Sequence, residues 1–344
     1  MSGQPSKYPL VERAHIVPKA YLRFFAVDEK IVLRLVERPS ERPVTSIDNA
    51  AVRKRFYRRT RGDGTKIDDV EWSMSHIESQ LPRIVSGIED RWPLSDEEKA
   101  ILAEFLSLQF LRSPAFAAWQ RRSAEEEVAK WEAEGRIYLR SGKKATPEER
   151  ERAIRLLSED TFRLTKMLSL IPKAASAFGS MHWSLVRFEQ PVLATSDHPV
   201  VRWPIAAGSR RPEREPDILG LMELLEVRVA LTPWLALLMT WLDDADTPGT
   251  LAGARHHAIN HNSFVVAQAE TQWFHRPNTT PRLGTGRFLP LSADLVRGYD
   301  AHVAVASRRR QRVQADLNRR IGIQFEKEFQ MVTVKRQNGE GRAA

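Results

Sequence analysis

The sequence predicts an α+β protein in which a helical middle segment packs against a mainly antiparallel or mixed sheet built from residues 181–241. Apolar residues recur at steps of three and four through residues 68–170, which is the spacing of helices with one buried face. After residue 176, stretches rich in β-forming residues are separated by Pro, Gly or Asp, which is typical of strands joined by turns. With 344 residues, of which 42% are hydrophobic, the chain is long enough to bury a sizeable core.

Residues 1–65 are expected to form an arm, a short helix, a strand and a basic segment. Pro18 stands where the first turn of a helix tolerates proline, and apolar residues at helical spacing follow it. Residues 31–36 alternate between apolar and polar in their centre, which predicts a strand.

Residues 66–178 are expected to form the helical segment. Ser95 followed by Glu98 is a capping box that begins one helix, and Thr146 before Pro147 is the start of another. The expected helices cover residues 68–90, 96–111, 116–135 and 148–169.

Residues 179–300 are expected to hold the sheet and further helix, and 301–344 a basic C-terminal helix and tail. Residues 11–275 would then form one integrated domain with a C-terminal extension. The expected strands cover residues 181–188, 192–195, 224–231 and 235–241. The expected later helices cover residues 250–273, 292–299 and 314–325.

Several classes of protein are excluded by what the sequence lacks. It has no cysteine, which excludes disulfides, zinc ribbons, iron–sulfur clusters and catalytic thiols. It also lacks the glycine-rich phosphate loops and the G-x-S-x-G elbow of serine hydrolases. There is no apolar stretch long enough for a membrane span and no apolar leader at the N-terminus. We therefore predict a soluble cytoplasmic protein without a membrane partner.

The net charge of +9 is concentrated in two places. The first basic segment, residues 53–66, has a net charge of +6, and the second, residues 307–320, has a net charge of +5. Local excess of this kind is typical of a surface that meets a polyanion, although a solvated arginine-rich surface is the alternative. The candidate contacts with nucleic acid are Arg53, Lys54, Arg55, Tyr57, Arg58, Arg59, Arg308, Arg309 and Arg310.

Five polar residues stand in apolar surroundings and are candidates for a site. Asp197 follows an expected strand and precedes a proline, so its carboxylate faces a cleft or closes an Asx turn. His15 precedes the proline-started helix and either caps it or projects into a pocket. Glu78, Gln109 and Arg112 lie on apolar helices and need partners. The alternatives for Arg112 are a helix–helix ion pair with Glu78 and contact with an anionic substrate.

The pattern His15-x-x-Pro18-x-x-Tyr21-Leu22-x-x-Phe25 resembles the opening of the bacterial domain-of-unknown-function 4238 family. The similarity covers roughly residues 11–275, and the family pattern more often has Asn where this chain has His198. The later matching motifs are Phe56-Tyr57, Gln109-x-x-Arg112-x-Pro114 and Ser196-Asp197-x-Pro199. The resemblance implies a composite site of His15, Glu78, Gln109, Arg112, Asp197 and Asn262, but no established chemistry.

Two functions follow as hypotheses. The first is a nuclease-like enzyme that processes a phosphodiester or nucleotide. Arg112 would hold phosphate and His15 would be the general acid or base. Asp197 and Glu78 would orient His15 or hold Mg²⁺, if a metal is used at all, since the sequence nominates no metal site. Gln109 and Asn262 would then bind substrate.

The second hypothesis is a non-catalytic protein that binds nucleic acid or a protein partner through the two basic segments. Its affinity would fall steeply with salt, because phosphate contacts release counterions. A third alternative is that the composite polar set only fixes the fold as a buried network.

Overall fold

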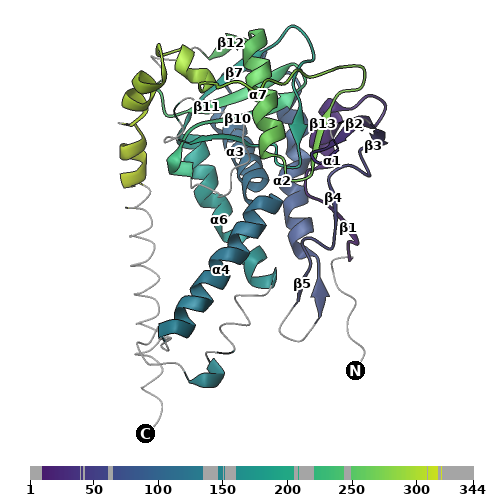
Figure 1. The fold of residues 1–344 in the computed structure, drawn as a ribbon, viewed down its shortest axis with the longest axis vertical. Coiled ribbons are helices and arrows are strands. Elements are labelled where there is room, and N and C mark those ends of the chain that lie inside the picture. The colour runs from purple at the N-terminus through teal and green to yellow at the C-terminus, as the bar shows by residue number, and fades with distance from the viewer. Residues whose placement is uncertain are drawn as a thin grey trace.

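The structure is a computed structural model. It describes residues 10–38, 40–41, 43–60, 65–134, 146–149, 151, 160–204, 208, 221–243, 249–307, 309–316 and 319. Two sheets lie together at one end of the molecule, and helices α4 and α6 extend away from them (Figure 1). The fold is α+β, as the sequence predicts.

The larger sheet has five strands in the order β12-β7-β11-β10-β9. All neighbours are antiparallel except β12 and β7, which are parallel, so the sheet is mixed. β10 and β11 are buried along nearly their whole length because both faces of the sheet are covered. Its strands are β7 (His182–Arg187), β9 (Val201–Pro204), β10 (Leu224–Thr232), β11 (Leu235–Thr240) and β12 (Thr250–Ala252).

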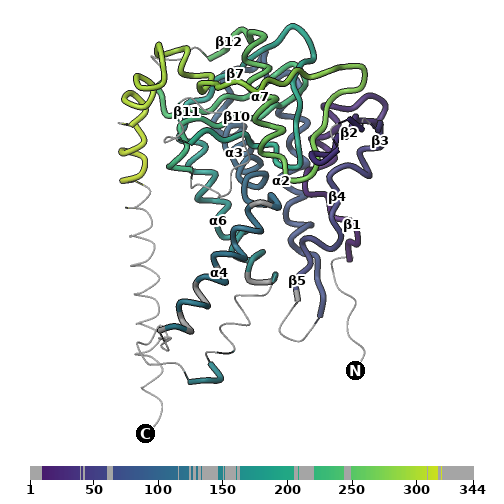
Figure 2. The backbone as a smooth tube through the Cα atoms, viewed as in Figure 1, coloured from purple at the N-terminus to yellow at the C-terminus, as the bar shows by residue number. Residues whose placement is uncertain are grey.

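The smaller sheet joins segments that are far apart in the sequence, in the order β3-β2-β13-β8. Figure 2 shows its purple N-terminal strands beside the green segment of β13. Its strands are β2 (Lys30–Leu35), β3 (Val44–Ser46), β8 (Thr195–Ser196) and β13 (Gln272–His275). Two further antiparallel pairs are β1 (Arg13–His15) with β4 (Val52–Lys54), and β5 (Arg59–Thr60) with β6 (Lys66–Ile67).

The helices pack on both sides of the sheets. The longer ones are α2 (Asp69–Val85), α3 (Asp96–Leu111), α4 (Pro114–Glu134), α6 (Asp160–Ser180) and α7 (Arg255–Gln268). The short ones are α1 (Lys19–Leu22) and the 3-10 helices η1 (Arg23–Phe25), η3 (Leu221–Glu223) and η5 (Leu291–Asp294). Residues 299–307 and 309–316 are also helical. None of the described helices combines the length and hydropathy needed to cross a membrane.

Specific side chains fix these elements to one another. Tyr21 of α1 donates a hydrogen bond of 2.6 Å to the carbonyl of Ala230 in β10, and its hydroxyl lies 2.9 Å from Oγ1 of Thr195 in β8. The opening motif therefore ties the N-terminal helix to both sheets. On the other side, Gln268 of α7 bonds both backbone groups of Arg202 in β9. This contact covers the edge of the larger sheet.

Three expected elements differ from the structure, the first of them because of pairing with distant strands. The helix expected over 250–273 is shorter, because β12 pairs with β7 before it and β13 pairs with β2 after it. Of the strand expected over 192–195 only Thr195 is included. The helix expected over 292–299 is only the short η5.

In the helical segment, α3 has the predicted bounds, and the Ser95 side chain accepts from the amide of Glu98. α6 continues to Ser180, eleven residues beyond the expected end at 169. Residues 150 and 152–159 of that expected helix, and most of the helix expected over 314–325, lie outside the described residues.

Candidate functional site

Three of the predicted site residues meet at the interface of α2 and α3. Arg112, which is 1% exposed, donates from Nη1 to Oε1 of Glu78. With the Gln109 amide oriented to accept, its oxygen lies 3.0 Å from Nη2 and 3.2 Å from Nε of Arg112. The guanidinium is therefore held by the protein's own side chains. This is the helix–helix ion pair that the sequence offered as the alternative to substrate contact.

Glu71 lies beside this ion pair and was not nominated from the sequence. It precedes Glu78 by two helical turns on α2, and its Oε2 has no hydrogen-bond partner in the part of the chain that the structure describes. Burial raises the pKa of Glu71 to about 7; the charge of Arg112 opposes this shift and that of Glu78 adds to it. A carboxyl group that titrates near neutrality is found both at functional sites and in structural ion-pair networks.

Asp197 is separate from that cluster and its carboxylate is fully engaged. Oδ2 accepts hydrogen bonds from the amides of Thr271 and Gln272 and from the hydroxyl of Thr271, at 2.8 to 3.0 Å, while Oδ1 accepts from the amide of Glu270 at 2.8 Å. Burial raises the pKa of Asp197, against these four bonds, which favour its charged form. The Asp-x-Pro motif thus fixes the start of β13 to β8 through bonds to distant residues, and not through the local Asx turn that the sequence offered as one alternative.

His15 lies at a third place, at the end of β1. Burial lowers the pKa of this half-buried imidazole, opposed by hydrogen bonding to the backbone of Ile47. Among the described residues, no hydrogen bond or ion pair links His15 with Glu78, Arg112 or Asp197. The predicted composite site is therefore divided among separate polar networks.

The first basic segment is largely engaged in ion pairs within the protein. Arg58 lies 3.0 Å from Glu12 and 3.2 Å from Asp68. Arg55 also bonds Glu12, at 2.7 Å, and Arg59 pairs with the first residue of α2. These contacts fasten the N-terminal segment and the β5–β6 hairpin to α2.

The other residues of the first basic segment differ in their exposure to solvent. Tyr57 is 1% exposed and therefore unavailable for stacking on a base in this conformation. Arg53 donates to Oγ1 of Thr271 at 3.2 Å, and Lys54 is exposed.

The second basic segment is partly docked on the larger sheet. Nη1 of Arg309 donates to the carbonyl of Leu242 at 2.9 Å and lies 3.7 Å from Asp243. Arg310 is half-buried, and Arg308 lies outside the described residues.

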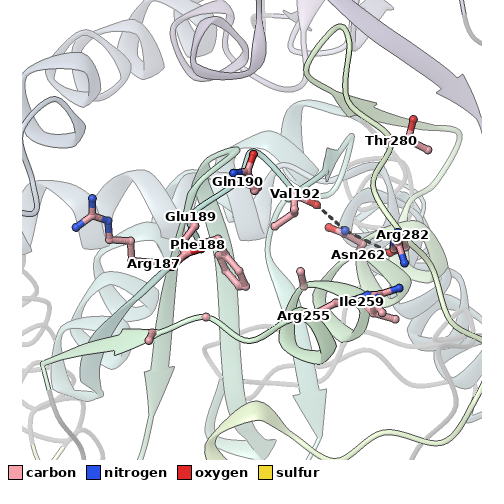
Figure 3. Close-up of a pocket in the computed structure, with 13 residues that line it drawn as sticks. Arg187, Phe188, Glu189, Gln190, Val192, Arg255, Ile259, Asn262, Thr280 and Arg282 are labelled. Atoms are coloured by element: carbon pink, nitrogen blue, oxygen red, sulfur yellow. Dashed lines mark hydrogen bonds between the residues drawn. The ribbon is translucent and has the colours of Figure 1, made fainter.

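A pocket of about 410 Å³ lies beside the N-terminal end of α7. Figure 3 shows its walls: the loop after β7, the first turns of α7, and the segment around Arg282. The residues that line it include Phe188, Val192, Arg255, Ile259, Asn262 and Arg282. Of the residues nominated from the sequence, only Asn262 lines this pocket.

Positive charge dominates the pocket lining. Arg255 and Arg282 are both exposed, and Glu189 is the only acidic residue among the described residues that line the pocket. Arg187 also belongs to the lining, but it is paired with Glu89 at 3.2 Å and points away from the other labelled side chains (Figure 3).

The start of α7 adds to this positive potential. The first turn of the helix, Arg255-His256-His257, contains no acidic residue. A helix N-terminus carries partial positive charge, and its first amides lack intrahelical acceptors. The end of α7 that borders the pocket is therefore suited to an anion.

Gly253 leaves room for an aromatic ring in the pocket lining. A Cβ at Gly253 would lie 2.4 Å from Cε1 of Phe188, so only glycine allows this ring to lie against the backbone. With Val192 and Ile259, the ring adds apolar surface to a lining that also contains the two arginines.

His256, His257 and Asp294 form a cluster that we tested as a metal centre. Their ligand atoms lie within 4.8 Å of one another, and Oδ2 of Asp294 is 3.4 Å and 3.2 Å from Nε2 of the two histidines. However, Nδ1 of His257 accepts the amide of Ala254 at 3.2 Å, which places the ring hydrogen on Nε2. Metal-bound histidines donate from their second nitrogen instead. The three residues therefore do not fit a metal ion in this arrangement.

Comparison with known proteins places the chain by its sequence. The family described as a protein of unknown function, DUF4238, matches residues 13–279. The chain belongs to the DUF4238 family. No curated protein and no solved structure matches this DUF4238 protein. The matched range includes the α2–α3 cluster, Asp197 and most of the pocket lining, and ends just before Thr280 and Arg282.

The pocket was missed from the sequence because its arginines have no characteristic spacing. Arg255 and Arg282 come from segments whose proximity depends on how α7 packs. One local signal was present: a helix that begins Arg-His-His without an acidic residue runs against the usual preference of helix N-termini.

Proposed function

We propose that this DUF4238 protein binds a nucleotide, or a phosphate ester of similar size, in the pocket beside α7. The observation that carries the proposal is that two exposed arginines and a helix with no acidic residue in its first turn border one cavity of about 410 Å³. Cavities that hold small ligands commonly measure about 300–1,000 Å³.

The charged side of the pocket suits phosphate. Arginine presents a planar fork of donors that matches phosphate oxygens, and helix amides supply further donors. Arg255 and Arg282 approach from different chain segments, so a phosphate between them would contact both walls. Charge-assisted hydrogen bonds of this kind are stronger than neutral ones.

The apolar side suits the rest of such a ligand. Phe188, Val192 and Ile259 line the cavity and give it apolar surface for the rest of the ligand. A ligand with a phosphate at one end and a flat apolar group at the other matches this division.

This proposal keeps the nucleotide of the sequence hypothesis and changes the residues that hold it. Arg112 is buried and occupied by Glu78 and Gln109, whereas Arg255 and Arg282 are exposed at a cavity. The acid–base role of His15 stays a prediction, as does the role of Asp197 and Glu78 in orienting it or holding Mg²⁺. Binding of nucleic acid by the two basic segments is kept as a second hypothesis, because the arginines of the first basic segment are mostly paired with acidic residues.

Calorimetric titration with adenosine and guanosine 5′-monophosphates tests the proposal, with the matching nucleosides as ligands that lack phosphate. Arg282→Gln is expected to weaken nucleotide binding at least about tenfold, because a charged contact is worth about 1.5–3 kcal/mol. Arg187→Gln is the matched control, since its side chain points away and pairs with Glu89; we expect its affinity to stay within about twofold. Equal affinity for nucleotide and nucleoside, or an Arg282→Gln protein that binds like wild type, contradicts the proposal.

A further inference from the structure

We infer that Asn262 is the positioning residue of the pocket beside α7, because it holds two of the pocket walls against the helix. The inference rests on the proposed function and extends it. Asn262 is 0% exposed, so it acts through the walls and not by direct contact with a ligand.

The side-chain amide of Asn262 makes three hydrogen bonds, all to backbone groups of these walls. Oδ1 accepts from the amide of Ala194 at 2.9 Å, while Nδ2 donates to the carbonyl of Val192 at 2.8 Å and to that of Arg282 at 3.4 Å. Figure 3 shows the two bonds from Nδ2 reaching in different directions, one to each wall. A single side chain thus sets the distance between the loop after β7 and the segment that carries Arg282.

The next residue of the helix strengthens the second of these contacts. Oγ of Ser263 accepts from the amide of Gly284 at 2.8 Å. A Cβ at Gly284 would lie 3.0 Å from both Cγ2 of Ile259 and Cζ of Phe288, so glycine allows the chain to approach α7 closely. The Arg-Leu-Gly-Thr-Gly-Arg stretch, which has no phosphate-loop frame in the sequence, is therefore a wall docked on α7.

The position of the Arg282 guanidinium depends on this docking. Its backbone carbonyl is fixed by Asn262 and the chain two residues later is fixed by Ser263, whereas its side chain is exposed. When the Asn262 contacts are removed, Arg282 samples more positions, and binding must then supply the ordering free energy. Asn262, which is one of the positions that the family resemblance implies, thus supports the pocket without touching the ligand.

The test compares Asn262→Ala with Asn260→Ala, a matched loss of a buried asparagine on the same helix. Asn260 bonds the carbonyl of Leu289 and the guanidinium of Arg228 and lies outside the pocket lining. We expect Asn262→Ala to weaken binding of adenosine 5′-monophosphate about tenfold and Asn260→Ala less than about threefold. Ser263→Ala, which releases the amide of Gly284 and removes the hydroxyl's own bond to the carbonyl of Ile259 within α7, is the milder variant if Asn262→Ala does not fold, and we expect about a threefold loss.

Hydrogen exchange in the ligand-free proteins separates this inference from the proposed function. Peptides covering residues 190–194 and 280–284 should exchange faster in Asn262→Ala than in Asn260→Ala, whether or not a nucleotide binds. If wild type binds no nucleotide but both segments exchange faster, the proposed function fails and the positioning role stands. Unchanged exchange in either segment, or equal losses of affinity in the two variants, overturns the inference.

Discussion

The α2–α3 interface and the pocket beside α7 both contain arginines, but they differ in what surrounds them. Arg112 is 1% exposed and has a carboxylate and an amide as partners. Arg255 and Arg282 are exposed, and their pocket has a single acidic residue in its lining. The first arrangement neutralises its own charge, while the second leaves positive charge at a cavity.

The difference shows why a polar residue in an apolar pattern is a weak guide to function. A buried charge requires partners, and the contacts among Glu78, Gln109 and Arg112 meet that requirement. An exposed arginine at a helix N-terminus has no such structural requirement. The second kind of residue is therefore the better candidate for ligand contact.

The largest expected effect follows from breaking the buried pair. Arg112→Met removes the partner of Glu78 and should lower the free energy of unfolding by about 3 kcal/mol, which is typical of a broken buried ion pair. Arg282→Met, the same change at the pocket, should alter stability by less than about 0.5 kcal/mol. Urea unfolding of both variants measures this contrast; similar losses in the two proteins would show that the comparison is wrong.

A comparable effect, dependent on pH, is expected at Glu71. Because burial raises the pKa of Glu71 from 4.5 to about 7, the folded state holds a proton that the unfolded state releases between these values. The stabilisation is thus present below about pH 4.5 and is lost as the pH rises to about 7. Glu71→Gln removes this dependence, and at pH 8 it should be more stable relative to wild type than at pH 4, by about 3 kcal/mol.

The measurement is urea unfolding of wild type and Glu71→Gln at both pH values. Taking the difference between the proteins cancels the titration of groups that they share. A difference that stays constant from pH 4 to pH 8 would mean that Glu71 has an ordinary pKa in the folded protein.

Local signals predicted the parts of the fold that local interactions determine. The Ser95 capping box gave α3 its exact bounds, and alternation located β2 within a residue. By contrast, the helix expected over 250–273 takes in the first two residues of β13, Gln272–His275. β13 is a strand only because β2, far away in the sequence, pairs with it and Asp197 bonds its first amides.

The candidate site was predictable to a similar extent. The sequence predicts that three polar residues on apolar helices need partners. They are partners of one another, because the packing of α2 on α3 brings together Glu78, Gln109 and Arg112. The pocket could not be assembled from spacing, since Phe188, Arg255 and Arg282 meet only through the packing of α7. Its walls are also held by Asn262, whose partners are backbone groups that carry no sequence signal.

The smallest expected effect is a change in the free energy of unfolding that has opposite signs at two helix N-termini. Arg255 places a cation in the first turn of α7, whereas α3 begins with Asp96-Glu97-Glu98. Charges in the first turn contribute about 0.3–1 kcal/mol through the helix dipole. Arg255→Gln should therefore stabilise the ligand-free protein by about 0.5 kcal/mol, while Glu97→Gln should destabilise it by a similar amount.

Thermal unfolding at low ionic strength measures both changes, and 0.5 M salt should reduce them because salt screens exposed charges. Adding adenosine 5′-monophosphate should then raise the melting temperature of wild type more than that of Arg255→Gln, since a ligand stabilises the state that binds it. Destabilisation by Arg255→Gln in the absence of ligand would show that this arginine has a structural role, and would remove the contrast between the two arginine environments.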